Sequence, residues 1–180
     1  MRKMLLASAA VLAVAFAAPA FADDSIANIT QTGGSTNSAT QAQAGSYNNV
    51  SASSNGGSNT IQQTQISNGL FGAAGYANTA TATQAGSSNQ IYQTQNGGGD
   101  GSGNSNVLSA NQSGNNDFVS QNQQGNANSG FAEQLYGNGN SATQAQNGSY
   151  NTASASSWGN NNTANISQTG NNNSATQTQH

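Results

Sequence analysis

The chain has 180 residues, of which 33% are hydrophobic and only 4% charged, and it contains no cysteine. Its two basic residues stand against five acidic ones, which gives a formal net charge of −3. So few basic residues argue against nucleic-acid binding, because phosphates are held mainly by Lys and Arg. The composition alone is typical of a disordered polar chain or of one prone to β-aggregation.

The N-terminus has the layout of an export signal. Basic residues 2 and 3 precede an apolar stretch at residues 5–18, and Ala20-Phe21-Ala22 forms a small-x-small cleavage signal. We predict a secretory signal peptide over 1–22, since the apolar stretch is too short for a membrane span. The predicted mature repeat domain, 23–180, has no Lys or Arg and no cysteine, so disulfides cannot replace a missing core.

A Gly-x-x-Asn motif recurs twelve times along the predicted mature chain and once carries Asp in place of Asn. The turn glycines of this motif are Gly34, Gly45, Gly56, Gly75, Gly86, Gly103, Gly114, Gly125, Gly137, Gly148, Gly159 and Gly170. Successive motifs are mostly 11 residues apart, with longer spacings between Asn59 and Asn78 and between Asn89 and Asn106. A fixed period of this kind indicates a repeat architecture.

Within each unit the regular residues fall at every second position, which is typical of a β-strand. Each unit therefore reads as a strand of seven residues starting at the Asn, followed by a four-residue turn in which Gly permits a positive φ. An incomplete unit at 25–31 precedes the first turn. The sequence predicts an all-β fold of about thirteen short strands built from 11-residue half-repeats.

A second period of about 22 residues lies over the first. The fourth residue after each Asn position alternates between Gln and Ala, as in Gln41, Ala52, Gln63 and Ala82. Similar side chains would therefore come into vertical register if two strands formed one rung (strand–turn–strand) of a two-sheet parallel β-solenoid. The regular positions would face inward between the sheets, and residues such as Thr79 would face outward.

Buried amides cost free energy unless they are paired, so we expect stacked amides to form hydrogen-bonded ladders as in amyloid-like cross-β assemblies. The predicted self-assembly ladder comprises Ser25, Gln31, Asn37, Gln43, Asn48, Asn59, Gln65, Asn78, Gln84, Asn89, Gln95, Asn106, Gln112, Gln123, Asn128, Gln134, Asn140, Gln146, Asn151, Asn162, Gln168, Asn173 and Gln179. Ser54 and Ser157 stand where this pattern expects Gln.

The two longer spacings correspond to insertions near 67–74 and 97–102. Both follow a Gln-rich strand, so both should emerge at the same edge of the solenoid. They read as surface loops, with Leu70 and Phe71 as an alternative contact point. Asp100 lies in a Gly-rich stretch, but a single carboxylate is poor evidence for a calcium loop.

These repeats resemble those of the curlin family, whose pattern is Ser-x5-Gln-x-Gly-x-x-Asn-x-Ala-x3-Gln. The first two predicted strands match it at Ser25, Gln31, Asn37, Ala39 and Gln43, with one extra residue before Asn37. The last two match its second part at Gln168, Gly170, Asn173, Ala175 and Gln179. The resemblance extends over essentially all of 25–180.

The resemblance implies an exported subunit that self-assembles into extracellular amyloid fibres of the curli type, for biofilm matrix, adhesion and aggregation. It also implies two partners besides further copies of the chain, namely a nucleator subunit and an outer-membrane secretion pore. Nucleator subunits of the family carry basic residues in their repeats. Since this predicted mature chain has none, the major, fibre-forming role is favoured.

The terminal strands suggest how copies would join. The inward residues of 25–31 and 37–43 nearly repeat those of 162–168 and 173–179. The Gln/Ala alternation breaks at Ile166, and stacking the first strand of the next subunit on 162–168 would place Ile29 over Ile166. We therefore expect head-to-tail growth through unpaired strand edges.

Other chemistry finds little support. The five acids are scattered without a basic partner, and the single histidine is the terminal His180, so neither enzymatic activity nor a bound metal or cofactor is expected. Asp117 occupies an Asn position of the ladder, either as a harmless substitution near water or as a gatekeeper whose charge slows assembly.

Two rival functions are kept open. One is a monomeric β-solenoid that binds ice or another surface through outward Thr and Ser rows, such as Thr79, Thr81 and Thr83, although aromatic residues interrupt those rows. The other is a disordered Asn/Gln-rich matrix polymer.

Overall fold

A computed structural model describes residues 25–34, 36–45, 47–67, 78–97 and 106–180, and within these ranges the chain forms only strands, turns and bends. One sheet consists of β1 (Ile26–Thr32), β3 (Asn49–Gly57), β5 (Thr79–Ser87), β7 (Val107–Asn115), β9 (Ser129–Asn138), β11 (Thr152–Trp158) and β13 (Ser174–Gln179). The other consists of β2 (Ser38–Ala44), β4 (Thr60–Ser67), β6 (Gln90–Gly97), β8 (Phe118–Gln124), β10 (Ser141–Asn147) and β12 (Thr163–Thr169).

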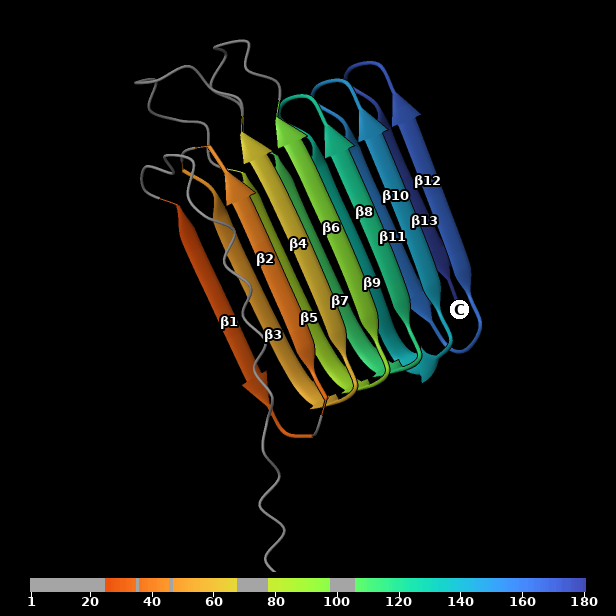
Figure 1. Cartoon of the computed structure of the whole chain (residues 1–180). Coiled ribbons are helices and arrows are strands. Elements are labelled where there is room, and N and C mark those ends of the chain that lie inside the picture. Colours follow the sequence, from red (N-terminus) through yellow and green to blue (C-terminus); the bar gives the residue numbers. More distant parts are fainter. Residues whose placement is uncertain (1–24, 35, 46, 68–77, 98–105) are drawn as a thin grey trace, which may run out of the picture.

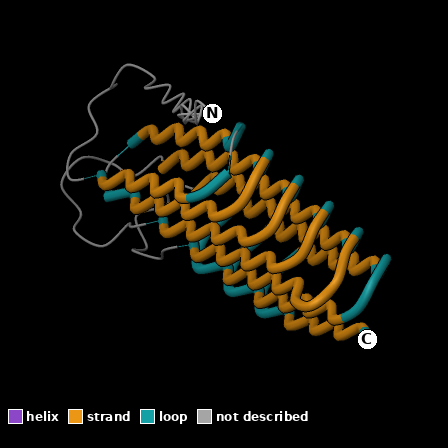
Figure 2. The backbone as a smooth tube through the Cα atoms, turned by 90° about the horizontal axis from the view of Figure 1, so that it is seen from below, coloured by secondary structure: helices purple, strands orange, loops and turns teal. Residues whose placement is uncertain are grey.

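The chain passes from one sheet to the other at every turn, so odd strands form one layer and even strands the second (Figure 1). Every pairing is parallel and each strand lies beside the strand two positions along the chain. Seen from below, the two layers run the whole length of the molecule and are linked by turns on both sides (Figure 2). The predicted two-sheet parallel solenoid of thirteen strands is confirmed.

The strands pair in register, and equivalent repeat positions are partners. Gln65 pairs with Gln95 across β4 and β6, and Gln84 pairs with Gln112 across β5 and β7. The two insertions follow β4 and β6, both of the even sheet, as the spacing predicted. Apart from Ser67 and Gly97, which end β4 and β6, the predicted insertions near 67–74 and 97–102 lie outside the described part of the chain, as does the predicted signal peptide.

Each strand begins one residue after the Asn position at which it was predicted to start. Ser38 rather than Asn37 opens β2, for example, although Asn59 still accepts the N–H of Ser38 through its carbonyl at 2.8 Å. The Asn residue therefore contributes to the ladder from the last position of the turn. A difference of one residue is within the usual ambiguity of strand ends.

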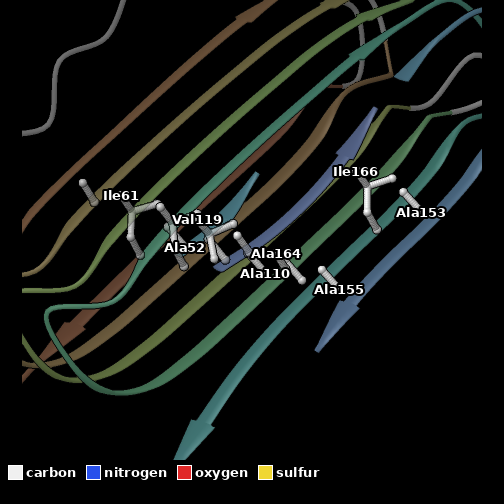
Figure 3. Packing of buried hydrophobic residues seen from close by; sticks show 13 residues of the cluster. Ala52, Ile61, Ala110, Val119, Ala153, Ala155, Ala164 and Ile166 are labelled. Atoms are coloured by element: carbon white, nitrogen blue, oxygen red, sulfur yellow. The ribbon is translucent and has the colours of Figure 1, made fainter. Parts of the chain in front are cut away.

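The core is thin and consists of inward residues that alternate with exposed ones, as in the fully alternating burial of β12. Between the sheets lies a row of small and branched apolar side chains, among them Ile61, Val119 and Ile166 (Figure 3). Gly130 leaves room for its neighbour Leu108, because a Cβ built on Gly130 would lie 2.7 Å from Leu108 Cδ2. The absence of a side chain at Gly130 is thus compensated by a larger one in the adjacent strand.

Within the described ranges, no helix is long and apolar enough to cross a membrane.

Candidate assembly interface

A continuous ladder of glutamine amides runs up the even sheet. Nε2 of each Gln donates to Oε1 of the Gln on the next strand of the same sheet. The ladder runs from Gln43 through Gln65, Gln95, Gln123 and Gln146 to Gln168, at donor–acceptor distances from 2.6 to 3.3 Å. The second N–H of these amides bonds to a backbone carbonyl of the facing sheet, as from Gln65 to Asn49 at 3.2 Å. Because every amide donates toward the C-terminal strands, the ladder has a direction.

A second ladder uses glutamines that the sequence analysis noted only as an alternation. Gln41, Gln63, Gln93, Gln121 and Gln144 are linked in the same direction at 2.8 to 2.9 Å. In the odd sheet the matching position is Ala, which leaves space for these amides to reach the facing backbone. The alternation of Gln and Ala was therefore the signal that could have added these five residues to the predicted ladder.

The asparagines form a different kind of ladder from the amide-to-amide stack that was expected. In most units Oδ1 of the Asn accepts the backbone N–H of the next Asn in the column, as Asn37 does from Asn59 at 3.1 Å. Asn48 Oδ1 is an exception and is buried without a partner in the described part of the chain. The Nδ2 of the Asn bonds to the carbonyl of the turn Gly one rung further on, as from Asn59 to Gly86 at 3.0 Å. Asn has one methylene fewer than Gln, so its amide stays beside the turn and satisfies backbone groups there.

The same arrangement holds along both sheets. The N–H of the next residue in the column is accepted by Asn59, Asn78, Asn89, Asn106, Asn128, Asn140 and Asn151. Ser25 takes the Asn position in the first strand, where its Oγ accepts from the N–H of Asn48 at 3.2 Å and donates to the carbonyl of Gly45 at 3.3 Å. A single hydroxyl thus reproduces both contacts of the amide.

The turn glycines stack closely on one another. Every turn glycine in the described ranges has a positive φ except Gly137, whose unit is one residue longer and places Tyr136 and Gly139 in that conformation. A Cβ on Gly86 would collide with the carbonyl oxygen of Gly114 in the next rung. The turns therefore need Gly for close stacking as well as for φ. Gly75 and Gly103 lie outside the described residues.

The turns also contain a left-handed position that the sequence analysis missed. It is the residue before the Asn, and in the described ranges it is usually not Gly: Ser58, Ser88, Tyr150 and Asn161 have φ between 57° and 60°, while Gly139 takes this position before Asn140. The variety of residue types at this position left no compositional signal, whereas the recurring Gly did.

Ser54 and Ser157 interrupt the ladder of the odd sheet, in which Gln84, Gln112 and Gln134 are linked at 2.9 Å. Ser54 pairs with Gln31 on one side and Gln84 on the other. Its shorter side chain reaches neither amide, and Gln31 Nε2, Gln84 Oε1 and Ser54 Oγ are buried without hydrogen-bond partners in the described part of the chain. Gln179 Oε1 and Ser157 Oγ are likewise buried without partners in the described part of the chain.

Asp117 lies in the Asn column of the even sheet and is 1% exposed. Its Oδ1 accepts the N–H of Asn140 at 2.9 Å, as an Asn would. Burial raises the pKa of the carboxyl above its ordinary value, and the hydrogen bonds from Asn140 oppose that change only in part. No cluster of three or more metal-ligating His, Cys, Asp or Glu side chains occurs in the described ranges.

The inward columns are closed in the middle of the molecule and open at both ends. Gln65, Gln95 and Gln112 are fully buried, whereas Gln31, Gln43 and Gln179, which belong to the same kind of position, are only partly buried. Among the described residues, the outer edges of β1, β2, β12 and β13 pair with no other strand. These two terminal rungs form the candidate assembly interface.

Comparisons with protein-family models, with curated proteins and with solved structures found no match.

Proposed function

We propose that this chain is a structural subunit that self-assembles into extracellular cross-β fibres of the curli type, for biofilm matrix, adhesion and aggregation. The observation that carries the proposal is the pair of unpaired terminal edges, where Gln31, Gln43 and Gln179 are only partly buried although Gln at the same position is fully buried in the interior strands. A further copy of the chain offers the same strand direction, spacing and amide columns. Unpaired strand edges of this kind template the addition of strands.

The low charge of the chain favours the same outcome. The formal net charge of the whole chain is −3, and Asp117 and Glu133 are the acidic side chains in the described ranges. Adjacent identical subunits therefore repel one another weakly. Fibre growth would extend the amide ladders without stacking Asp117 or Glu133 on the same residue of the next copy.

The two other partners rest on the resemblance alone. A chain exported by the signal peptide at 1–22 would pass an outer-membrane pore and meet a nucleator subunit at the cell surface. Its fibres would then remain associated with the cell.

The surface-binding alternative needs a regular array of outward hydroxyls. Thr81 and Thr83 are exposed on β5, but their row meets Phe131, which is 37% exposed on β9. On the even sheet Tyr92 and Phe118 form a ring contact with centroids 5.9 Å apart. The outer faces are thus mixed, and we favour the terminal rungs over the faces as the binding surface.

Incubation of purified residues 23–180 near neutral pH tests the proposal. Dye-positive, detergent-resistant fibres with a cross-β diffraction pattern are expected. A folded monomer with thermal hysteresis would instead support ice binding, and a persistent coil spectrum would support a disordered matrix polymer.

A truncated chain tests the role of the terminal rung. Deleting 162–180 removes β12 and β13 and should sharply slow seeded elongation, since the new last rung ends in Gln144 and Ala155 rather than Ile166 and Gln177. Unchanged elongation kinetics would contradict head-to-tail growth.

A further inference from the structure

The number of strands restricts how two subunits can stack. The described residues place seven strands in one sheet and six in the other. If each subunit kept its odd sheet on the odd sheet of its neighbour, one sheet of the fibre would lack a strand at every junction. Both sheets stay continuous only if the odd sheet of each subunit continues the even sheet of the one before it.

We infer that successive subunits in the fibre are related by a half turn about the fibre axis, with β1 of the incoming copy on β12 and β2 on β13. This inference rests on the proposed function, because it describes the junction of the same fibre. The half turn exchanges the two sheets and reverses the strand direction, so that the strands remain parallel to those they join. Figure 1 shows β12 alone at the far edge of the even sheet, where the incoming β1 would lie.

The residue four places after the Asn position provides independent support. In the odd sheet it is Ala from β3 to β11, but Ile29 in β1 and Gln177 in β13. In the even sheet it is Gln from β2 to β10, but Ile166 in β12. Each terminal residue thus breaks the pattern of its own sheet.

The half turn resolves both breaks. It places Ile29 on Ile166 and Gln41 on Gln177, so that identical residue types stack at the junction in both sheets. Stacking without the half turn places Ile29 on Gln177, an apolar side chain on an amide, and leaves Gln41 and Ile166 facing each other across the missing strand. Of these two arrangements, only the half turn therefore stacks matching residues at the terminal rungs.

The direction of the amide ladders completes the junction. Gln41 Oε1 is buried without a partner in the described part of the chain. Each amide of this ladder donates toward the C-terminal strands, so Gln41 donates to Gln63 but receives no hydrogen bond from it. At the other end Gln168 and Gln179 each donate to one backbone carbonyl, those of Thr152 and Thr163, and lack the Gln above that interior amides use. After a half turn Gln168 faces Gln31, and Gln177 and Gln179 face Gln41 and Gln43. Acceptors at the β1/β2 end therefore meet donors at the β12/β13 end.

Asn173 follows the same rule. Interior Asn residues bond through Nδ2 to the turn Gly of the next rung, as Asn151 does to Gly170 at 2.8 Å. The Nδ2 of Asn173 bonds instead to the carbonyl of Thr169, four residues before it in the same chain. In the half-turn junction, Gly34 of the incoming subunit takes the place of that missing turn.

Pyrene labels on outward positions test the half turn. Asn28, Asn165 and Thr176 are all exposed, and the chain has no cysteine of its own. Fibres grown from equal amounts of labelled Asn28→Cys and Asn165→Cys subunits should show excimer emission, since these positions become neighbours on adjacent strands about 4.8 Å apart. The matched pair Asn28→Cys and Thr176→Cys should show none, because the half turn puts those positions on opposite faces.

Helical reconstruction of unlabelled wild-type fibres provides a second measurement that needs no variant. Thirteen strands shared between two sheets give a rise of about 31 Å per subunit at a strand spacing of about 4.8 Å. We expect a rotation near 180° per subunit, plus the residual twist of the sheets. A rotation near 0°, or excimer emission from the Asn28→Cys and Thr176→Cys pair, would overturn the half turn and leave the proposed function intact. Failure of the wild-type chain to form fibres would overturn both.

Discussion

Asp117 accepts the backbone N–H of Asn140 through Oδ1 at 2.9 Å, while its Oδ2 is buried and has no partner in the described part of the chain. The neighbouring Asn89 has a donor at the corresponding place, and its Nδ2 bonds to the carbonyls of Ala85 and Gly114 at 3.0 Å. An Asn at position 117 would carry a donor where the carboxylate carries an acceptor. Asp117 therefore leaves one buried oxygen of the Asn column in the even sheet without a partner in the described part of the chain.

The first prediction concerns this substitution. Asp117→Asn should shorten the lag of fibre formation at neutral pH and stabilise the folded rung by about 1–3 kcal/mol, the usual cost of a buried polar atom without a partner. Dye fluorescence at equal protein concentration measures the lag. Equal lag times for the variant and the wild type would contradict the gatekeeper role of Asp117.

An exposed residue of the same sheet provides the control. Asn122 faces outward on β8. Asn122→Asp adds a charge without burying it and should change the lag less than Asp117→Asn does. A larger effect at Asn122 would indicate that net charge, rather than the buried carboxylate, controls assembly.

The second prediction is a pH dependence. Burial raises the pKa of Asp117 above 3.8, so the folded state binds its proton more tightly than the unfolded chain does. The resulting stabilisation is fully present below the unfolded pKa and is lost as the pH rises through the folded pKa. Fibre formation by the wild type should thus be faster on the acid side of that interval.

Lag times measured across this interval for wild type and Asp117→Asn test the assignment. The variant has no carboxyl at this position, so its lag should depend less on pH. The same pH profile for both chains would show that the dependence does not come from Asp117.

The columns of inward Asn and Gln residues separate the features that the sequence predicts from those that it does not. The 11-residue spacing predicted the thirteen strands, their register and the inward set, because period 2 along the strand and period 22 along the chain fix which residues stack. It did not predict that Asn would bond to the backbone while Gln bonds to Gln, since that depends on the length of the side chain beside a turn. Nor did it predict the left-handed residue before each Asn, which any of several residue types can fill. At the terminal rungs, Ile166 was visible as a break in the pattern, whereas the role of Gln177 required the strand order of both sheets.

The third prediction repairs an interrupted ladder. Gln at position 54 could accept from Gln31 and donate to Gln84, whose facing atoms are both buried without partners in the described part of the chain. Ser54→Gln should therefore stabilise the fibre by about 0.5–1.5 kcal/mol for each new bond and so raise the guanidinium concentration needed to dissolve it. The neighbouring Ser53→Gln, which faces outward on β3, should leave that midpoint unchanged. A midpoint for Ser54→Gln at or below that of the wild type would show that the rung has no room for the longer amide.

The fourth prediction concerns the pairing of Leu108 with Gly130. Gly130→Ala places a methyl group 2.7 Å from Leu108 Cδ2, which should cost about 1–3 kcal/mol by overpacking. Leu108→Ala alone should cost about 2–5 kcal/mol through the cavity that it leaves. Since the two side chains share one space, the double variant should cost less than the two single costs together. Denaturant midpoints of all four chains measure the coupling, and strict additivity would contradict the shared packing.

The last prediction separates the stability of the subunit from that of the junction. Gln144 Nε2 bonds to the carbonyl of Phe131 at 2.6 Å and has Ile166, not another amide, as its register partner in β12. Ile166→Gln would extend the ladder within one subunit, but it would set an amide against Ile29 of the next. Seeded elongation should therefore slow although the subunit itself is not destabilised. Adding Ile29→Gln places Gln on Gln at the junction and should restore much of the elongation rate. If the double variant elongates no faster than Ile166→Gln alone, these two positions do not meet in the fibre.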